Sequence, residues 1–236
     1  MLLDAGFVPM TSDDAYVSAL FGYLLIRLGG WDFGDRLSYD LSLLDDPVVL
    51  EAAQALEYMA YRGFFHENIE HNVWPTGQYD IASGDVTMYL NGTWLVNEIF
   101  DTTGPDFRWG AFNWPVFPNG MSGMEAATFG SQAFAINRNS PYPQEAFELI
   151  VHLTTGLWDE VLAAETFGVP VSGLAMWPHQ LEEARVIFDN LTQAVSWVAG
   201  VEDHPEAGVY VRLNVQRLVG GSITAEEFIE NIKARR

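Results

Sequence analysis

The chain has 236 residues, 49% of them hydrophobic, which is enough to fill the core of one large domain or two small ones. Thirty-two acidic residues against eleven basic ones give a formal net charge of -21, which argues against nucleic acid as a partner because both would be anionic. The absence of cysteine excludes a disulfide framework, a thiolate nucleophile and a cysteine-ligated metal site.

The first part of the chain shows two helical patterns. Thr11 followed by Asp14 predicts a helix start, and apolar residues then recur at helical spacing up to Gly29-Gly30. Those residues are Tyr16, Ala19, Leu20, Tyr23 and Leu24. Asp46 before Pro47 predicts a second helix, with a capping side chain and a first-turn proline.

Residues 74–128 have a different texture, with short apolar runs broken by Gly, Pro and Asn. This texture predicts brief strands and long loops, and residues 86–90 and 109–112 are two such strands. Residues 133–136 predict a further, buried strand, and Ser140-Pro141 predicts a capped helix after it.

The last part of the chain predicts further helices. One apolar stripe consists of Leu181, Ala184, Phe188 and Leu191, and another of Val211, Val215 and Leu218. Thr224 with Glu227 three residues later forms a capping box that predicts the start of a terminal helix. Helices interleaved with short strands predict an α/β protein.

The start of the chain lacks the marks of a signal peptide. Residues 1–7 have neither a basic region nor a long apolar region, and no apolar run approaches the roughly 20 residues of a membrane span. We therefore expect either a cytosolic protein or a chain whose natural start lies upstream.

The segment from Ile81 to Trp94 is the most informative motif. It predicts a helix end at Ser83-Gly84, a short buried strand, and a tight turn at Gly92 that places Trp94 at a strand end. Ligands of α/β folds usually bind at strand ends, so Trp94 is a candidate ligand contact. The alternative is a tryptophan that packs in the core.

This segment resembles the F-x-x-G-x-x-A-M-x-x-x-G-x-W pattern of the family 1 extracellular solute-binding proteins, the group that includes maltose-binding protein. The matching positions are Gly84, Met88, Gly92 and Trp94. The chain departs from the pattern at Ile81, where an aromatic residue is usual, and at Thr87, where alanine is usual. Both departures fall on packing positions.

Further stretches are similar to the same family, in the same order along the chain. They are Gly29-Gly30-Trp31, the helix from Asp46-Pro47 to Gly63, Trp109-Gly110 through Pro118, Gly130 to Ile136 with Ser140 and Ala146, Phe167 to Pro170, and Gly220 to Ile232. The resemblance covers nearly the entire chain and implies an α/β, periplasmic-binding-protein-like fold of type II.

Members of this family fold as two lobes that close on a sugar. By analogy, residues 1–107 form the first part of the carboxy-terminal lobe, residues 108–156 return to the amino-terminal lobe, and residues 157–236 complete the carboxy-terminal lobe. Most of the amino-terminal lobe has no counterpart in this chain, and neither has the signal or lipoprotein segment that precedes it. We expect that the chain is truncated or that another chain supplies the remainder.

Sugar binding requires flat aromatic side chains beside fixed hydrogen-bonding groups. The resemblance assigns this role most directly to Trp94 after Gly92. Gly130 and Ser131 match the family's loop that approaches the ligand, where glycine permits close approach and serine bonds a hydroxyl. Further aromatic candidates are Trp31, Trp177 and Tyr210. The alternatives are core packing for the aromatics and a strand-entry turn for the loop.

Other chemistry has weaker support. His66 and His71 enclose two carboxylates, but a spacing of five residues does not share a helical face and matches no zinc signature, so we expect no metal and no cofactor. A glycosidase would need two carboxylates placed across a sugar, and no motif isolates such a pair. The sequence contains no phosphate-binding loop, dinucleotide motif or catalytic triad motif.

The resemblance thus implies binding of a sugar or oligosaccharide outside the cytoplasm, in the periplasm or as a cell-surface lipoprotein. The sugar would be delivered to the permease of an ABC importer, and no reaction would be catalysed. Contact with the membrane would occur only through a lipid anchor or the permease. Two alternatives stay open, a glycosidase-like carbohydrate-active enzyme and a truncated fragment that binds nothing.

Overall fold

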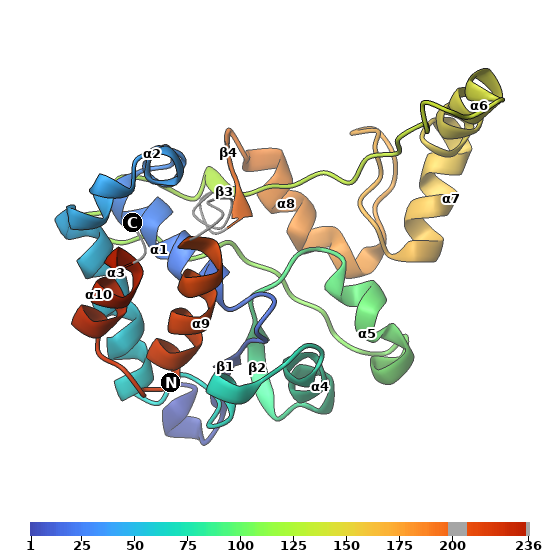
Figure 1. Cartoon of the computed structure of the whole chain (residues 1–236). Helices are drawn as coiled ribbons and strands as arrows, with labels where there is room; N and C mark the ends of the chain where they lie inside the picture. The colour runs from blue at the N-terminus through green and yellow to red at the C-terminus, as the bar shows by residue number, and fades with distance from the viewer. Residues whose placement is uncertain (198–206, 235–236) are drawn as a thin grey trace. The chain divides into compact units, whose positions relative to one another are not determined.

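A computed structural model describes residues 1–197 and 207–234 (Figure 1). The chain forms two compact units, and each has its own hydrophobic cluster. The first unit consists of Met1–Asn91, Asn113–Phe129 and Asn190–Arg236. The second unit consists of Gly92–Phe112 and Gly130–Asp189.

The first unit contains most of the helices and all four strands of the described residues. In chain order these elements are η1 (Leu3–Ala5), β1 (Val8–Thr11), α1 (Ser18–Gly29), α2 (Phe33–Tyr39), η2 (Leu41–Asp45), α3 (Pro47–Tyr61), η3 (Ile69–His71), α4 (Thr76–Ser83), β2 (Val86–Tyr89), β3 (Ala126–Thr128), β4 (Gln193–Val195), α9 (Ala207–Val219) and α10 (Ala225–Lys233).

Helix α1 is the centre of the first unit. Its residues are buried without a break from Ser18 to Leu28, the pattern of a helix that other elements surround. Helices α3 and α9 pack against α1, and α10 packs against α3 and α9 (Figure 1). Phe21 of α1 meets Phe228 of α10 edge to face, with ring centres 5.0 Å apart. The main core therefore lies among these four helices.

Two short parallel sheets lie beside this helical core. Strand β1 pairs with β2, with Val8 opposite Val86 and Thr11 opposite Tyr89. Strand β3 pairs with β4, with Ala126 opposite Gln193. Because the strands of each pair are parallel, their carboxyl ends lie at one edge, where the residues that follow β1 and β2 meet.

The structure confirms two of the helix starts that were predicted from capping residues. The Asp46 carboxylate accepts a hydrogen bond from the Val48 amide at 3.0 Å, and α3 begins at Pro47. At the start of α10, the Thr224 hydroxyl and the Glu227 carboxylate each accept a hydrogen bond from the other residue's backbone amide. The predicted stripe on α9 is also confirmed as a buried face.

The predicted helix start at Thr11 is wrong. Thr11 is the last residue of β1 and lies opposite Tyr89, and α1 begins only at Ser18. The intervening residues form a turn in which the amides of Tyr16 and Val17 both donate to the Asp13 carbonyl at 2.9 Å. The sequence around Thr11 did not reveal strand β1, because its partner β2 lies far along the chain.

The second unit is built from helices. They are α5 (Leu95–Thr103), α6 (Pro143–Leu153), α7 (Gly156–Thr166), η4 (His179–Leu181) and α8 (Glu182–Asn190). The helix predicted after Ser140 forms as α6, but it begins at Pro143 after Tyr142 and has no side-chain cap. Helix α5 occupies residues for which only strands and loops are predicted. Val96, Leu181 and Ala184 form a small buried cluster.

Two predicted strands are absent from the described part of the second unit. Residues 109–112 and 133–136 are not strands, and residues 133–135 are exposed rather than buried. Strand-forming sequence becomes a strand only beside a neighbour that satisfies its backbone groups. The strand predicted at residues 86–90 does form, as β2, because β1 supplies that neighbour.

The assignment of residues 1–107, 108–156 and 157–236 to two lobes stays a prediction, because the compact units are defined within this chain alone. Across residues 1–197 and 207–234, none of the helices combines the length and apolar character that crossing a bilayer requires.

Candidate functional site

A buried carboxylate lies where β1 and β2 end. Asp13 follows β1 and is fully buried, and Tyr89 is the last residue of β2. The Tyr89 hydroxyl donates to Asp13 Oδ2 at 2.7 Å, and the Gly77 amide donates to Asp13 Oδ1 at 2.6 Å. The carboxylate therefore connects both strand ends with the first turn of α4.

Burial sets the protonation of this pair. It raises the pKa of the Asp13 carboxyl above its ordinary value, and hydrogen bonds from Tyr89, Gly77 and Gln78 lower that pKa only in part. Burial and the bond to Asp13 also raise the pKa of the Tyr89 hydroxyl far above its ordinary range. Tyr89 consequently stays protonated and acts as the donor.

The Tyr89 ring belongs to a group of three aromatic rings. Tyr16 meets the Tyr89 ring edge to face, with ring centres 6.1 Å apart, and meets the Trp197 ring in the same way at 6.2 Å. All three side chains are half-buried. We call Tyr16, Tyr89 and Trp197 the aromatic cluster. Aromatic faces next to hydrogen-bonding groups suit a ligand that has both apolar C–H faces and hydroxyls.

In the second unit, Gly92 and Trp94 lie in direct contact. A Cβ atom on Gly92 would collide with the six-membered ring of Trp94, so glycine is required for this approach. The sequence predicted Trp94 at a strand end. In the structure Trp94 lies instead at the start of helix α5. Its side chain is 39% exposed, so it is not a core tryptophan.

Two other predicted contacts lie in the first unit. Trp31 lies between Gly30, which has a φ of 101°, and the start of α2, and it is 43% exposed. Tyr210 lies on α9, half-buried, and its carbonyl accepts a hydrogen bond from the Asn214 side chain at 2.8 Å. Their contacts with a ligand stay predictions.

The remaining candidates differ in their surroundings. Gly130 and Ser131 are exposed, and a Cβ on Gly130 would meet open space, so no packing requires glycine there. Their contact with a ligand stays a prediction as well. Trp177 packs beside the small cluster of the second unit and meets Phe188 edge to face at 5.2 Å. This contact supports the packing interpretation of Trp177.

Sequence reasoning missed Asp13 and the aromatic cluster. From sequence alone, Tyr16 falls in an apolar helical stripe and Tyr89 in a short strand. Only the pairing of β1 with β2 brings Asp13 and Tyr89 together. Two acidic residues, Asp13-Asp14, begin two positions after the end of β1 and are a signal that would point to this edge once β1 is recognised.

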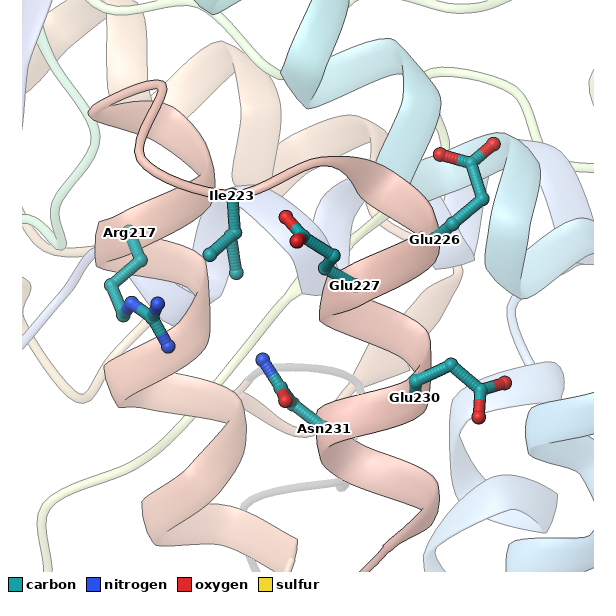
Figure 2. Close-up of a pocket in the computed structure, with 6 residues that line it drawn as sticks. All are labelled: Arg217, Ile223, Glu226, Glu227, Glu230 and Asn231. Carbon is teal, nitrogen blue, oxygen red and sulfur yellow. The ribbon is translucent and has the colours of Figure 1, made fainter.

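A surface hollow lies between α9 and α10. Arg217 on α9 and Asn231 on α10 lie on its two sides, and Glu227 points between the helices (Figure 2). Glu226 and Glu230 point away from α9 in the same view. Glu227 is engaged in the capping box of α10, and the Asn231 side chain donates to the Asn214 side chain at 2.8 Å.

The histidine pair gives no metal site in the described residues. His66 Nδ1 lies 3.9 Å from Asp80 Oδ2, whereas His71 is exposed. Within residues 1–197 and 207–234, no group of three or more His, Asp or Glu side chains is arranged to hold a metal ion.

Comparison with known proteins adds independent findings. A family profile described as "Bacterial extracellular solute-binding protein" matches residues 3–155. The sequence matches no curated protein at a significant level.

Solved structures match nearly the whole chain. A "Chitin oligosaccharide binding protein" aligns with a TM-score of 0.77 at 17% identity, over 98% of this chain and 60% of that one. RafE in complex with raffinose aligns with a TM-score of 0.73 at 16% identity, over 99% and 62%. A protein from work on xylan utilization by the thermophilic bacterium Caldanaerobius polysaccharolyticus aligns with a TM-score of 0.77 at 15% identity, over 99% of this chain and 62% of that one.

These likenesses confirm the predicted α/β, periplasmic-binding-protein-like fold. The chain spans only about 60% of the length of the solved structures it matches.

Proposed function

This chain belongs to the bacterial extracellular solute-binding protein family, and from that membership we propose that it binds a sugar or an oligosaccharide. The family is extracellular or periplasmic, so the proposed location is outside the cytoplasm. The bound sugar is delivered to the permease of an ABC importer, and the protein catalyses no reaction on it.

The observation that carries the proposal is the aromatic cluster beside Asp13. Tyr16, Tyr89 and Trp197 are half-buried rings that meet edge to face, with Tyr89 at the carboxyl end of β2, and Asp13 fixes the Tyr89 ring through its hydroxyl. A pyranose ring needs this combination, because its C–H faces stack on aromatic rings and its hydroxyls bond to polar groups. We propose this edge as the ligand contact of the first unit.

The similar structures support a carbohydrate over other solutes. One of these proteins binds chitin oligosaccharide, one comes from work on xylan utilization, and one is in complex with raffinose, and all three compounds are carbohydrates. We further propose that the residues predicted from the sequence are sugar contacts, each within its own unit. They are Trp31, Gly92, Trp94, Gly130, Ser131 and Tyr210.

A titration of the 236-residue chain with sugars tests this function. Calorimetry and tryptophan fluorescence would follow binding of chitin oligosaccharides, xylo-oligosaccharides and raffinose at up to millimolar concentrations, because a chain spanning 60% of its relatives offers fewer contacts. We expect binding without release of shorter products. Tyr16→Ala should weaken the best ligand about tenfold, since one stacking surface is lost.

The control is Tyr39→Ala, because Tyr39 is 92% exposed and lies outside the cluster. Product release would support the carbohydrate-active enzyme instead. No binding by the folded chain to any sugar would contradict the proposal and leave the non-binding fragment. Unchanged affinity in Tyr16→Ala would remove the cluster from the site.

A further inference from the structure

The chain contains two Asn-Gly pairs, Asn91-Gly92 and Asn119-Gly120. Asparagine before glycine is the pair most prone to spontaneous deamidation, because glycine has no side chain that keeps its backbone nitrogen away from the asparagine side chain. The reaction needs an asparagine side chain that water reaches and a backbone that can rearrange. The surroundings of the two pairs therefore decide which of them reacts in the folded chain.

Asn119 lies at the tip of an exposed turn. The Gly120 amide donates to the Phe117 carbonyl at 3.0 Å, which closes a β-turn with Pro118 and Asn119 at its two central positions. Both central residues are exposed. Water therefore reaches the Asn119 side chain, and the hydrogen bond of the turn has to open before the Gly120 nitrogen can react.

Glycine is required at position 120 by its packing. A Cβ atom there would lie 2.5 Å from the Arg27 carbonyl oxygen and 3.2 Å from the Phe117 carbonyl oxygen. The Arg27 carbonyl belongs to the last turn of α1, where carbonyls lack partners within the helix, and the Met121 amide donates to it at 2.8 Å. The close approach that completes the end of α1 thus keeps a glycine next to an exposed asparagine.

The other Asn-Gly pair is enclosed. The side-chain nitrogen of Asn91 is buried, and Asn91 and Gly92 are both half-buried. A Cβ atom on Gly92 would collide with the Trp94 ring, so the ring covers that side of Gly92. Water reaches the leaving nitrogen of Asn91 poorly, and the ring hinders the backbone rearrangement that the reaction needs.

We propose that Asn119 is a site of spontaneous deamidation in the folded chain, whereas Asn91 is protected. Solvent base removes the proton of the Gly120 amide, and the nitrogen attacks Cγ of Asn119. The bond from Cγ to Nδ2 breaks, ammonia leaves with a proton from water, and a succinimide ring remains. A second water molecule opens the ring at either carbonyl and leaves aspartate or isoaspartate.

The isoaspartate product would alter the end of α1. In isoaspartate the backbone runs through the former side chain, which adds one carbon atom to the chain directly before Gly120. The Gly120 packing and the Met121 hydrogen bond to the Arg27 carbonyl cannot both keep their places after this insertion. We therefore expect ageing of the protein to loosen the attachment of residues 117–122 to α1.

Incubation of the 236-residue chain in mildly alkaline buffer, followed by peptide mapping, tests the proposal. Mass spectrometry would measure the fraction of each Asn-Gly pair that is deamidated over time, and methylation by an isoaspartyl methyltransferase would report isoaspartate. The same incubation in denaturant, where neither pair keeps its tertiary surroundings, gives a reference rate for each pair.

In the folded chain we expect Asn119 to be deamidated several-fold faster than Asn91, whereas in denaturant the two should react at similar rates. Asn119→Gln should abolish the modification at that position and leave the slow rate of Asn91 unchanged. Equal rates in the folded chain, or a faster reaction at Asn91, would overturn the proposal. So would an unmodified Asn119 after a period in which the denatured chain has reacted.

Asn119→Asp separates the added charge from the added backbone atom. This variant carries the charge on an unaltered backbone at an exposed position, so its thermal transition should stay close to that of the fresh chain. The isoaspartate fraction, isolated by chromatography, should unfold at a lower temperature than either. An isoaspartate fraction as stable as the fresh chain would contradict the predicted effect on the end of α1. No sugar is present, so these outcomes are independent of the proposed function.

Discussion

The Tyr89 hydroxyl donates a hydrogen bond to the Asp13 carboxylate across the carboxyl ends of two parallel strands, with 2.7 Å between the oxygen atoms. The two residues are 76 positions apart in the sequence. Asp13 also accepts from the Gly77 amide, so one carboxylate fixes the ends of β1 and β2 and the start of α4. The orientation of the Tyr89 ring in the aromatic cluster depends on this bond.

Tyr89→Phe should destabilise the first unit while keeping the aromatic contact with Tyr16. The buried Asp13 carboxylate would lose the hydrogen bond from the Tyr89 hydroxyl, and we expect the free energy of unfolding to fall by about 1–3 kcal/mol. Denaturant titration at neutral pH measures this change. Tyr79→Phe is the matched control, because Tyr79 is exposed, and an equal effect of both variants would contradict the role of the bond.

The pH dependence of stability should report the buried carboxyl of Asp13. Burial raises its pKa in the folded state above the ordinary value of 3.8, so the folded chain holds this proton more tightly than the unfolded chain. Its contribution to stability is therefore fully present below 3.8 and is lost as the pH rises through the folded pKa. The stability of wild type minus that of Asp13→Asn should decrease in that range.

Asp40→Asn should show the opposite trend in the same measurement. Hydrogen bonds from the Ser42 hydroxyl and amide lower the pKa of the Asp40 carboxyl. Its contribution is present above the unfolded value and is lost as the pH falls through the folded pKa. Denaturant titrations of all three proteins from about pH 3 to about pH 7 provide the comparison. If the stability difference between wild type and variant changed with pH in the same direction for Asp13→Asn and Asp40→Asn, burial would not set the pKa of Asp13.

Local signals were sufficient for several helices. The capping residues Asp46 and Thr224 each lie directly before their helix, and the apolar stripe follows within a few positions, so α3 and α10 were predictable. The α/β class and the family resemblance were predictable for the same reason, because their motifs are short and ordered along the chain.

Features that depend on distant pairing were not predictable. Thr11 has a capping pattern, but pairing with Tyr89 across most of the first unit makes it a strand end. The aromatic cluster follows from that pairing, because Tyr16 and Trp197 are separated by most of the chain. The opposite error concerns residues 133–136. Their composition predicted a strand, but they pair with no strand in the described residues.

Arg27→Ala should be the most destabilising substitution of a basic residue in the first unit. Arg27 is fully buried, and its Nε and Nη1 atoms donate to the carbonyls of Trp114 and Ala126 at 2.9 Å each. Without these donors both carbonyls would lose a bond to a charged partner, and we expect a loss of about 3 kcal/mol or more in the free energy of unfolding.

Arg36→Ala is the control for this substitution in the same denaturant titration. Arg36 forms an exposed ion pair with Asp32 at 3.3 Å, and such pairs contribute within about 1 kcal/mol. If the Arg27 variant lost no more stability than this control, the two backbone contacts would not hold residues 113–129 to α1.

Gly92→Ala should disturb the orientation of Trp94 without unfolding the second unit. A methyl group at this position would collide with the six-membered ring of Trp94, and the ring has to turn because the side chain is the part that can move. Tryptophan fluorescence should therefore shift even without ligand. If Trp94 contacts the sugar as proposed, affinity should fall about tenfold, as in Trp94→Ala, because a fixed ring face is lost in both.

Gly173→Ala is the matched control for this substitution, because a Cβ at Gly173 meets open space and its backbone does not require glycine. Calorimetry with the best sugar of the panel compares the three variants. A shifted spectrum with unchanged affinity in both Gly92→Ala and Trp94→Ala would show that the ring is held by Gly92 but lies outside the ligand site. An unshifted spectrum in Gly92→Ala would instead show that the backbone gives way, since the added methyl group and the ring cannot occupy the same space.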